Sequence, residues 1–179
     1  ELTQTVSSPE ELASLDIYPN LAKLDLRGSD CYDAILSYIS SHPQVDVTYD
    51  IGLAGQRWSP DTTELTLADG SFRVEELLET IPYFPLMKCI SLPLTSLDAE
   101  SMTALKAGLN NVTLNYTVDI LGAETSPETE FLDLSAMYPE QMEKTVAAME
   151  LLPGLNHIQL MSDEGTSNLS LTDVRKIMD

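Results

Sequence analysis

The stretch SPDTTELTL, from Ser59 to Leu67, returns later in the chain as SPETEFLDL, from Ser126 to Leu134. The two copies lie a uniform 67 residues apart, and the offset extends upstream, since Gly55 corresponds to Gly122. Internal repetition at a fixed period is the sequence signature of repeat architectures. The repeat therefore decides what kind of fold the sequence predicts, although it does not disclose a chemical function.

Each repeated unit divides into three classes of short strand. One class reads Pro-x-apolar-x-x-apolar-x-Leu, as in PNLAKLDL from Pro19 to Leu26. We interpret residues 1–179 as a single repeat domain, with composite units at about 19–84 and 85–152 and partial units at both ends. The pattern predicts seven apolar-x-apolar strands, centred near Asp25, Asp46, Thr66, Ser91, Thr113, Asp133 and Gln159.

Helical patterns separate most of these strands. Apolar residues from Tyr32 to Ile39 follow the i, i+3, i+4, i+7 spacing of one helix face, and those from Val74 to Ile81 repeat it. The ranges 97–109 and 140–152 are similar but less regular. An earlier helix is predicted to open at Ser8–Glu11, with serine as the N-cap, proline at the first position and acids in the first turn.

The alternation of strand and helix at a period of about 20–26 residues is typical of a leucine-rich repeat. The segment LAKLDLRGSDC, from Leu21 to Cys31, resembles that family's pattern L-x-x-L-x-L-x-x-N/C-x-L, and MKCISLPLTSL, from Met87 to Leu97, does so too. Ser29 stands where the family usually has asparagine. The chain thus resembles an atypical, bacterial leucine-rich-repeat-like protein.

The resemblance implies an α/β solenoid, a horseshoe with about seven parallel strands on its concave side and helices and loops on its convex side. A doubly wound sheet is disfavoured because the connections recur by class and no phosphate loop follows the first strand. Strand side chains alternate between two faces, so one face should point into the core. The residues expected to point inward are Leu24, Leu26, Val45, Val47, Leu65, Leu67, Ile90, Leu92, Val112, Leu114, Leu132, Leu134, Ile158 and Leu160.

The charge of the chain limits the classes of partner that it is expected to bind. It has 29 acidic and 9 basic residues and a net charge of −20. Such a surface repels phosphate backbones and anionic lipid, which argues against nucleic acid and against membrane surfaces. No apolar stretch is long enough to insert into a bilayer. The acidity also motivates an alternative hypothesis, a structural domain that responds to divalent cations.

No catalytic constellation is recognisable, so no enzymatic activity, cofactor or metal site is expected. The two cysteines, Cys31 and Cys89, form no disulfide framework and are expected to be free. The chain begins at Glu1 rather than methionine. We expect it to be a binding module from a larger bacterial protein, secreted or on the cell surface, whose partner is a protein or a glycan. The last predicted strand would leave an open edge through which copies could associate.

The candidate binding site is the outward face of the predicted strands, together with one loop. The loops 50–59 and 117–126 occupy matched positions, yet they diverge in sequence, and only the first carries Arg57 and Trp58. The packing of Trp58 against the convex side remains an alternative to binding. The face residues are Lys23, Asp25, Arg27, Asp46, Thr48, Glu64, Thr66, Ser91, Thr113, Asn115, Phe131, Asp133, His157 and Gln159.

Overall fold

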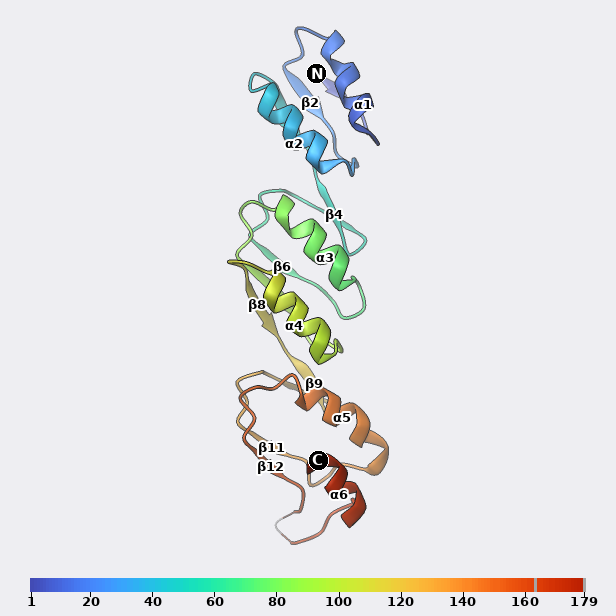
Figure 1. The fold of residues 1–179 in the computed structure, drawn as a ribbon, viewed down its shortest axis with the longest axis vertical. Helices are drawn as coiled ribbons and strands as arrows, with labels where there is room; N and C mark the ends of the chain where they lie inside the picture. Colours follow the sequence, from blue (N-terminus) through green and yellow to red (C-terminus); the bar gives the residue numbers. More distant parts are fainter. Residues whose placement is uncertain (163, 179) are drawn as a thin grey trace. The chain divides into compact units, whose positions relative to one another are not determined.

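The computed structural model describes residues 1–162 and 164–178. Within this part the chain forms six α-helices, three short 3-10 helices and twelve strands of two to four residues (Figure 1). Contacts divide the chain into two compact units. Unit 1 comprises Glu1–Glu64 and Ser71–Lys88, and unit 2 comprises Leu65–Gly70 and the chain from Cys89 onward.

Unit 1 alternates strands and helices in its first half and then forms a hairpin. Strands β1, β2 and β3 make a parallel sheet in that order, in which Leu24 lies in register between Leu2 and Val47. In chain order the elements are β1 (Leu2–Thr3), α1 (Pro9–Ala13), η1 (Ser14–Ile17), β2 (Lys23–Asp25), α2 (Tyr32–Ser41), β3 (Asp46–Thr48), β4 (Ile51–Leu53), β5 (Gln56–Trp58), α3 (Val74–Thr80) and η2 (Ile81–Tyr83).

The core of unit 1 lies where α1 and α2 pack on β2. The predicted start of α1 is confirmed: Ser8 Oγ accepts a hydrogen bond from the Glu11 N–H at 3.3 Å, with Pro9 at the first helical position. This satisfies one of the backbone donors that a helix leaves open at its start. The buried cluster consists of Val6, Leu12, Leu15, Leu24, Leu26, Ile35, Tyr38 and Val45.

Unit 2 contains a three-stranded sheet, a hairpin and a two-stranded parallel sheet. Strands β7 and β8 pair in parallel, with β6 on the other side of β7, and β11 pairs in parallel with β12. In chain order the elements are β6, which begins at Glu64 (Glu64–Thr66), β7 (Cys89–Leu92), α4 (Ala99–Gly108), β8 (Thr113–Tyr116), β9 (Val118–Ile120), β10 (Ala123–Thr125), β11 (Phe131–Asp133), η3 (Pro139–Gln141), α5 (Met142–Met149), β12 (His157–Gln159) and α6 (Leu171–Met178).

Two antiparallel hairpins, β4–β5 and β9–β10, take the place of the two predicted loops. The first turns at Ala54 and Gly55, with φ of 54° and 70°, and the second at Leu121 and Gly122, with φ of 52° and 88°. Two turn residues with positive φ characterise the type I′ turn, whose twist matches that of the strands it joins. The two hairpins have the same register at positions 67 residues apart.

The prediction of a leucine-rich-repeat-like solenoid is wrong. The described strands form five small sheets of two or three strands, with both parallel and antiparallel pairing, rather than one concave sheet of about seven parallel strands. The physical reason is the pair of hairpins: β4 is joined to β5, and β9 to β10, by a turn of only two residues. A parallel neighbour needs a long crossover connection, whereas a short turn joins antiparallel strands.

Other predictions about the fold are confirmed. All seven predicted strands are present, as β2, β3, β6, β7, β8, β11 and β12. None of the residues expected to point inward is exposed, and Leu26, Ile90 and Leu134 are completely buried. Cys31 and Cys89 are free thiols. No helix among the described residues is long and apolar enough to cross a membrane.

The turn of the first hairpin allows a test of this backbone geometry. Ala54 has a left-handed conformation that costs an alanine roughly 1–2 kcal/mol, and asparagine adopts it far more readily. We expect Ala54→Asn to raise the free energy of unfolding by about 1 kcal/mol in urea denaturation. The β-branched substitution Ala54→Val should lower it. A stabilising valine or a destabilising asparagine would show that this turn is not type I′.

Candidate functional site

The predicted face residues belong to three separate sheets, and their side chains lie on the outward faces of those sheets. In β2, β6 and β11 the central leucine is buried, while the residues on both sides of it are exposed or half-buried. The alternation of strand side chains explains this arrangement. The predicted residues are therefore brought together only within each sheet, as three small groups.

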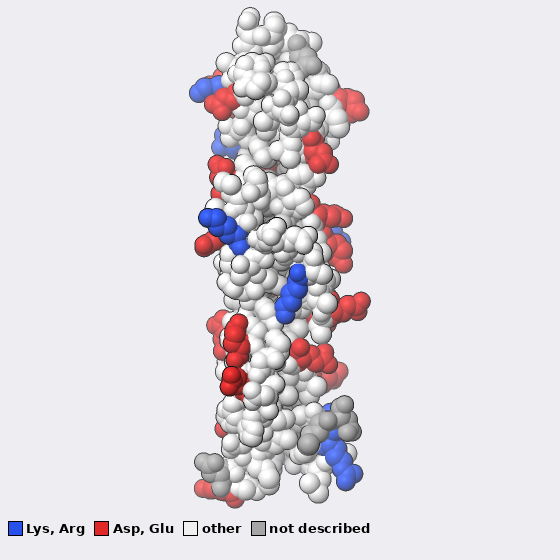
Figure 2. Space-filling view, turned by 60° about the vertical axis from the view of Figure 1, so that its left-hand side comes forward, with Lys and Arg blue, Asp and Glu red and all other residues white. Residues whose placement is uncertain are grey.

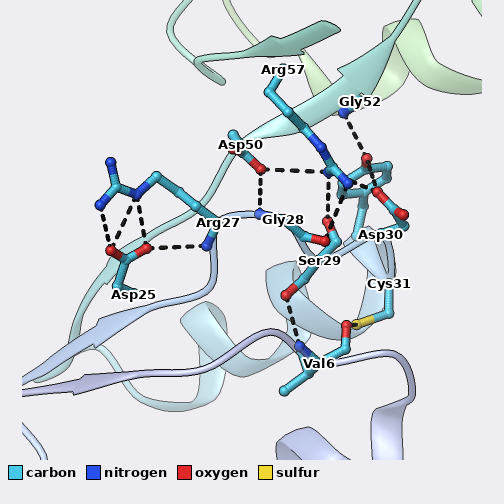
Figure 3. Close-up of polar contacts among 11 residues, drawn as sticks. Val6, Asp25, Arg27, Gly28, Ser29, Asp30, Cys31, Asp50, Gly52 and Arg57 are labelled. Carbon is cyan, nitrogen blue, oxygen red and sulfur yellow. Dashed lines mark hydrogen bonds and ion pairs between the residues drawn. The ribbon is translucent and has the colours of Figure 1, made fainter. Parts of the chain in front are cut away.

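The first group lies on β2 and β3 of unit 1. Lys23 is in register with Asp46, and Asp25 is in register with Thr48. Arg27 follows β2 and folds back onto Asp25, with Nη2 2.6 Å and Nε 3.0 Å from carboxylate oxygens (Figure 3). The Arg27 side chain, followed by its backbone N–H, holds the pKa of Asp25 down, from 3.8 to about 2. Asp25 and Arg27 thus neutralise each other's charge, so this pair offers little unpaired charge to a binding partner.

The second group lies on β6, β7 and β8. Ser91 is in register with Asn115, and Cys89 with Thr113. The Asn115 amide donates a hydrogen bond to Cys89 Sγ at 3.2 Å. Glu64 and Thr66 are exposed on β6. This group is polar and has no aromatic side chain, so it lacks the residue type that most often contributes strongly to protein binding.

The third group, on β11 and β12, contains an exposed aromatic pair. Phe131 is in register with His157, and their rings are stacked with centroids 5.6 Å apart and planes 24° apart. Phe131 is 47% exposed, while its neighbour Leu132 points inward and is 7% exposed. The Ser135 side chain, followed by the Ser135 N–H, which donates to the Asp133 carboxylate at 2.9 Å, lowers the pKa of Asp133. This pair makes the third group the strongest of the three candidates.

Arg57 was predicted as a binding residue of the loop. It lies on β5, and its guanidinium contacts other parts of the fold (Figure 3). Its guanidinium lies 2.7 Å from an Asp30 carboxylate oxygen and donates to the backbone carbonyls of Gly28 and Ser29 at 3.2 and 3.3 Å. The Gly28 N–H in turn donates to Asp50 Oδ1 at 2.8 Å. Arg57 therefore ties the first hairpin to the loop that precedes α2.

Trp58 is half-buried, and its indole N–H donates to the Leu53 carbonyl across the hairpin at 3.1 Å. This bond ties the two strands of the hairpin together. Sequence reasoning treated the segment as a loop and so missed these roles. The available signal was the alternation of Ile51 and Leu53 before Ala54-Gly55, which is a hairpin pattern.

A groove in unit 2 was also missed. It has a volume of about 490 Å³ and lies between the loop before α4, the β9–β10 hairpin and α5. Lys144 on α5 and Asp119 on β9 form an ion pair of 2.5 Å at this groove. Their approach depends on the hairpin, which the sequence analysis did not predict.

Acidic side chains do not gather into a metal site in the described ranges 1–162 and 164–178, where no group of three His, Cys, Asp or Glu side chains is placed to hold an ion. Figure 2 shows the Asp and Glu side chains spread over the visible face rather than gathered in one patch. The alternative hypothesis of a domain that responds to divalent cations gains no support from this arrangement.

The chain was compared with protein-family models, curated proteins and solved structures, and none of the three gives a significant match. The resemblance to leucine-rich-repeat proteins therefore stays a prediction from the sequence. Self-association through the last strand also stays a prediction; within the described part, β12 has β11 as its one neighbour.

The pKa of Asp25 gives a test of the first group. Because the folded-state pKa is lowered, the charged carboxylate stabilises the fold above pH about 4, and this contribution is lost as the pH falls towards 2. We expect NMR titration of the Asp25 carboxyl carbon to give a pKa near 2 in the native chain. In Arg27→Gln the value should move part of the way back, since the backbone N–H remains. An unchanged value would contradict the assigned cause.

The role of Arg57 is tested by urea denaturation. Arg57→Gln removes the ion pair and the two bonds to backbone carbonyls, and we expect the free energy of unfolding to fall by about 1–2 kcal/mol, since the guanidinium is partly exposed. Glu124 holds the matched place in the second hairpin, where its carboxylate accepts one hydrogen bond from Thr117. Glu124→Gln is the control and should change stability by less than about 0.5 kcal/mol. Equal effects of the two substitutions would refute the structural role of Arg57.

Proposed function

We propose that the chain is a non-catalytic module that binds a polypeptide partner through the outward face of β11 and β12. The observation that carries this proposal is the exposed stack of Phe131 on His157. Leu132 supplies the inward contact of β11, so the Phe131 ring is not needed to fill the core. A rigid, exposed aromatic side chain is the residue type that most often anchors a protein interface.

The polar neighbours of the stack support the same proposal. Asp133 is held by the Ser135 N–H, and the Gln159 amide donates to the Met161 carbonyl at 2.9 Å. Side chains that are already fixed lose less conformational entropy when a partner binds. The net charge of −20 favours a basic partner, because complementary charge speeds association and rejects acidic competitors.

Selection of peptide ligands from a random displayed library against the full chain tests the proposal. We expect selected ligands to be basic and to lose at least about tenfold in affinity to Phe131→Ala, measured by calorimetry, because truncating an anchor typically costs more than 1 kcal/mol. Thr113→Ala, on the exposed face of β8, is the matched control and should leave affinity unchanged. Circular dichroism verifies that both variants fold.

A library that yields no ligand, or ligands that bind Phe131→Ala as well as the native chain, would refute the assignment of the β11–β12 face.

A further inference from the structure

The groove in unit 2 combines apolar walls with an acidic rim. Leu94, Ala147 and Leu151 form part of its walls. Its volume of about 490 Å³ is within the usual range of ligand pockets, large enough for one or two side chains of a bound peptide. All of its lining residues belong to unit 2, so the groove is formed within one compact body.

The rim carries four acids, Asp69, Asp98, Asp119 and Glu150, and one cation, Lys144. Three of the acids are oriented by contacts of their own: Asp69 accepts from the Ser96 N–H and hydroxyl, Asp98 caps α4, and Asp119 pairs with Lys144. A carboxylate offers about four acceptor positions, so these contacts leave capacity for another donor. The excess of negative charge makes the groove complementary to a cation.

The matched place in unit 1 is a hollow of similar volume, about 460 Å³, but it is lined by Tyr32 and Arg57. Helices α2 and α4 are both ten residues long, and they start 67 residues apart, at Tyr32 and Ala99. The Tyr32 hydroxyl accepts a hydrogen bond from the Gly52 N–H at 2.8 Å, and the Arg57 guanidinium crosses from β5 to the loop before α2. A Cβ added at Gly52 would lie 3.4 Å from the Tyr32 hydroxyl and 3.5 Å from the Arg57 guanidinium carbon, so both side chains lie close against Gly52.

Unit 2 lacks these three residues. Ala99 stands in place of Tyr32, Glu124 in place of Arg57, and Asp119 in place of Gly52. The aromatic ring and the hairpin guanidinium are therefore missing, and a carboxylate is added where the first hairpin accommodates that guanidinium. These substitutions make the rim of the groove more negative than that of the matched hollow in unit 1.

Leu94 presents an apolar side chain at the groove from a fixed backbone conformation. It is 47% exposed, and its φ of 52° lies in the left-handed region, which is costly for a leucine. The Thr117 hydroxyl holds this conformation by accepting a hydrogen bond from the Leu94 N–H at 2.9 Å. Backbone strain held in place by its surroundings is common where proteins bind ligands.

We propose that this groove binds a polypeptide segment that presents an arginine next to an apolar side chain. The guanidinium would donate to the carboxylates of Asp98, Asp119 or Glu150, much as Arg57 donates within unit 1. The apolar neighbour would lie against Leu94 and Leu151. This site is distinct from the Phe131–His157 face, and the proposal does not depend on that face binding anything.

Titration of the full chain with acetyl-Leu-Arg-Leu-amide, followed by NMR, tests the proposal. We expect chemical-shift changes at Leu94, Asp119 and Ala147. The same peptide with citrulline in place of arginine keeps the shape and removes the charge, and it should bind at least about tenfold more weakly, since charged hydrogen bonds are involved.

Two variants should block the groove in different ways: one fills its volume, and the other supplies a guanidinium from within the chain. Ala147→Leu fills it from an exposed position on α5, whereas Ala107→Leu makes the same change on α4 outside the groove and is the control. Glu124→Arg places an arginine where Arg57 stands in the first hairpin, and Glu124→Gln is its control. We expect Ala147→Leu and Glu124→Arg to lose probe binding by at least about tenfold, and both controls to keep it.

Three results would each overturn the proposal: no shift changes at the groove up to about 10 mM probe, well above the affinities of specific sites; equal binding of the citrulline peptide; or unchanged binding to Ala147→Leu. The probe reports on the groove alone, so none of these results bears on the Phe131 test.

Discussion

A strand of three residues whose central side chain points inward buries that side chain alone, and this constraint governs β2, β6 and β11. The centre of β2, β6 or β11 is a leucine that reaches the core, and the residues on either side of it face outward. Each strand thus contributes about 1.5–3 kcal/mol of apolar burial from its central residue, which is too little to hold it in place alone. Adjacent helices such as α1 and α2 supply the rest of the core. The outward residues are left free for polar contacts, and only on β11 and β12 do they include a stacked aromatic pair.

The two hairpins share a backbone but differ in how their surroundings are completed. In a hairpin with a two-residue turn, the residues that flank the turn exchange both hydrogen bonds, so the next pair directs its N–H groups away from the partner strand. In unit 1 that outward N–H belongs to Gly52 and is satisfied by the Tyr32 hydroxyl. In unit 2 it belongs to Asp119, and Ala99 has no hydroxyl to offer. The same backbone therefore carries internal contacts to Tyr32 and to the loop before α2 in unit 1, and it lines an acidic groove in unit 2.

The sequence predicted the elements better than their assembly. The helix start at Ser8-Pro9, the seven strand positions and the inward residues all follow from local patterns, and the structure confirms them. The predicted face of α2 is confirmed only in part, because Leu36 is exposed while Tyr38 is buried. The hairpins were missed because Ala54-Gly55 and Leu121-Gly122 lack the asparagine or aspartate that usually marks a type I′ turn. Because the hairpins were not predicted, the strands of five separate sheets were assigned to one solenoid. The sequence predicted which residues face outward on the strands. It did not predict how they divide among the sheets, nor the acidic groove at Lys144, because both depend on contacts between segments distant in sequence.

The two hairpins match in backbone, while a neighbouring side chain accepts a hydrogen bond from the outward amide of only the first. Residue-resolved hydrogen exchange on the full chain tests this most directly at the amides of Gly52 and Asp119. After correction for intrinsic rates, the account predicts that the Gly52 amide exchanges much more slowly than the Asp119 amide, because only Gly52 donates to a neighbouring hydroxyl. Equal protection at the two amides, or stronger protection at Asp119, would contradict it.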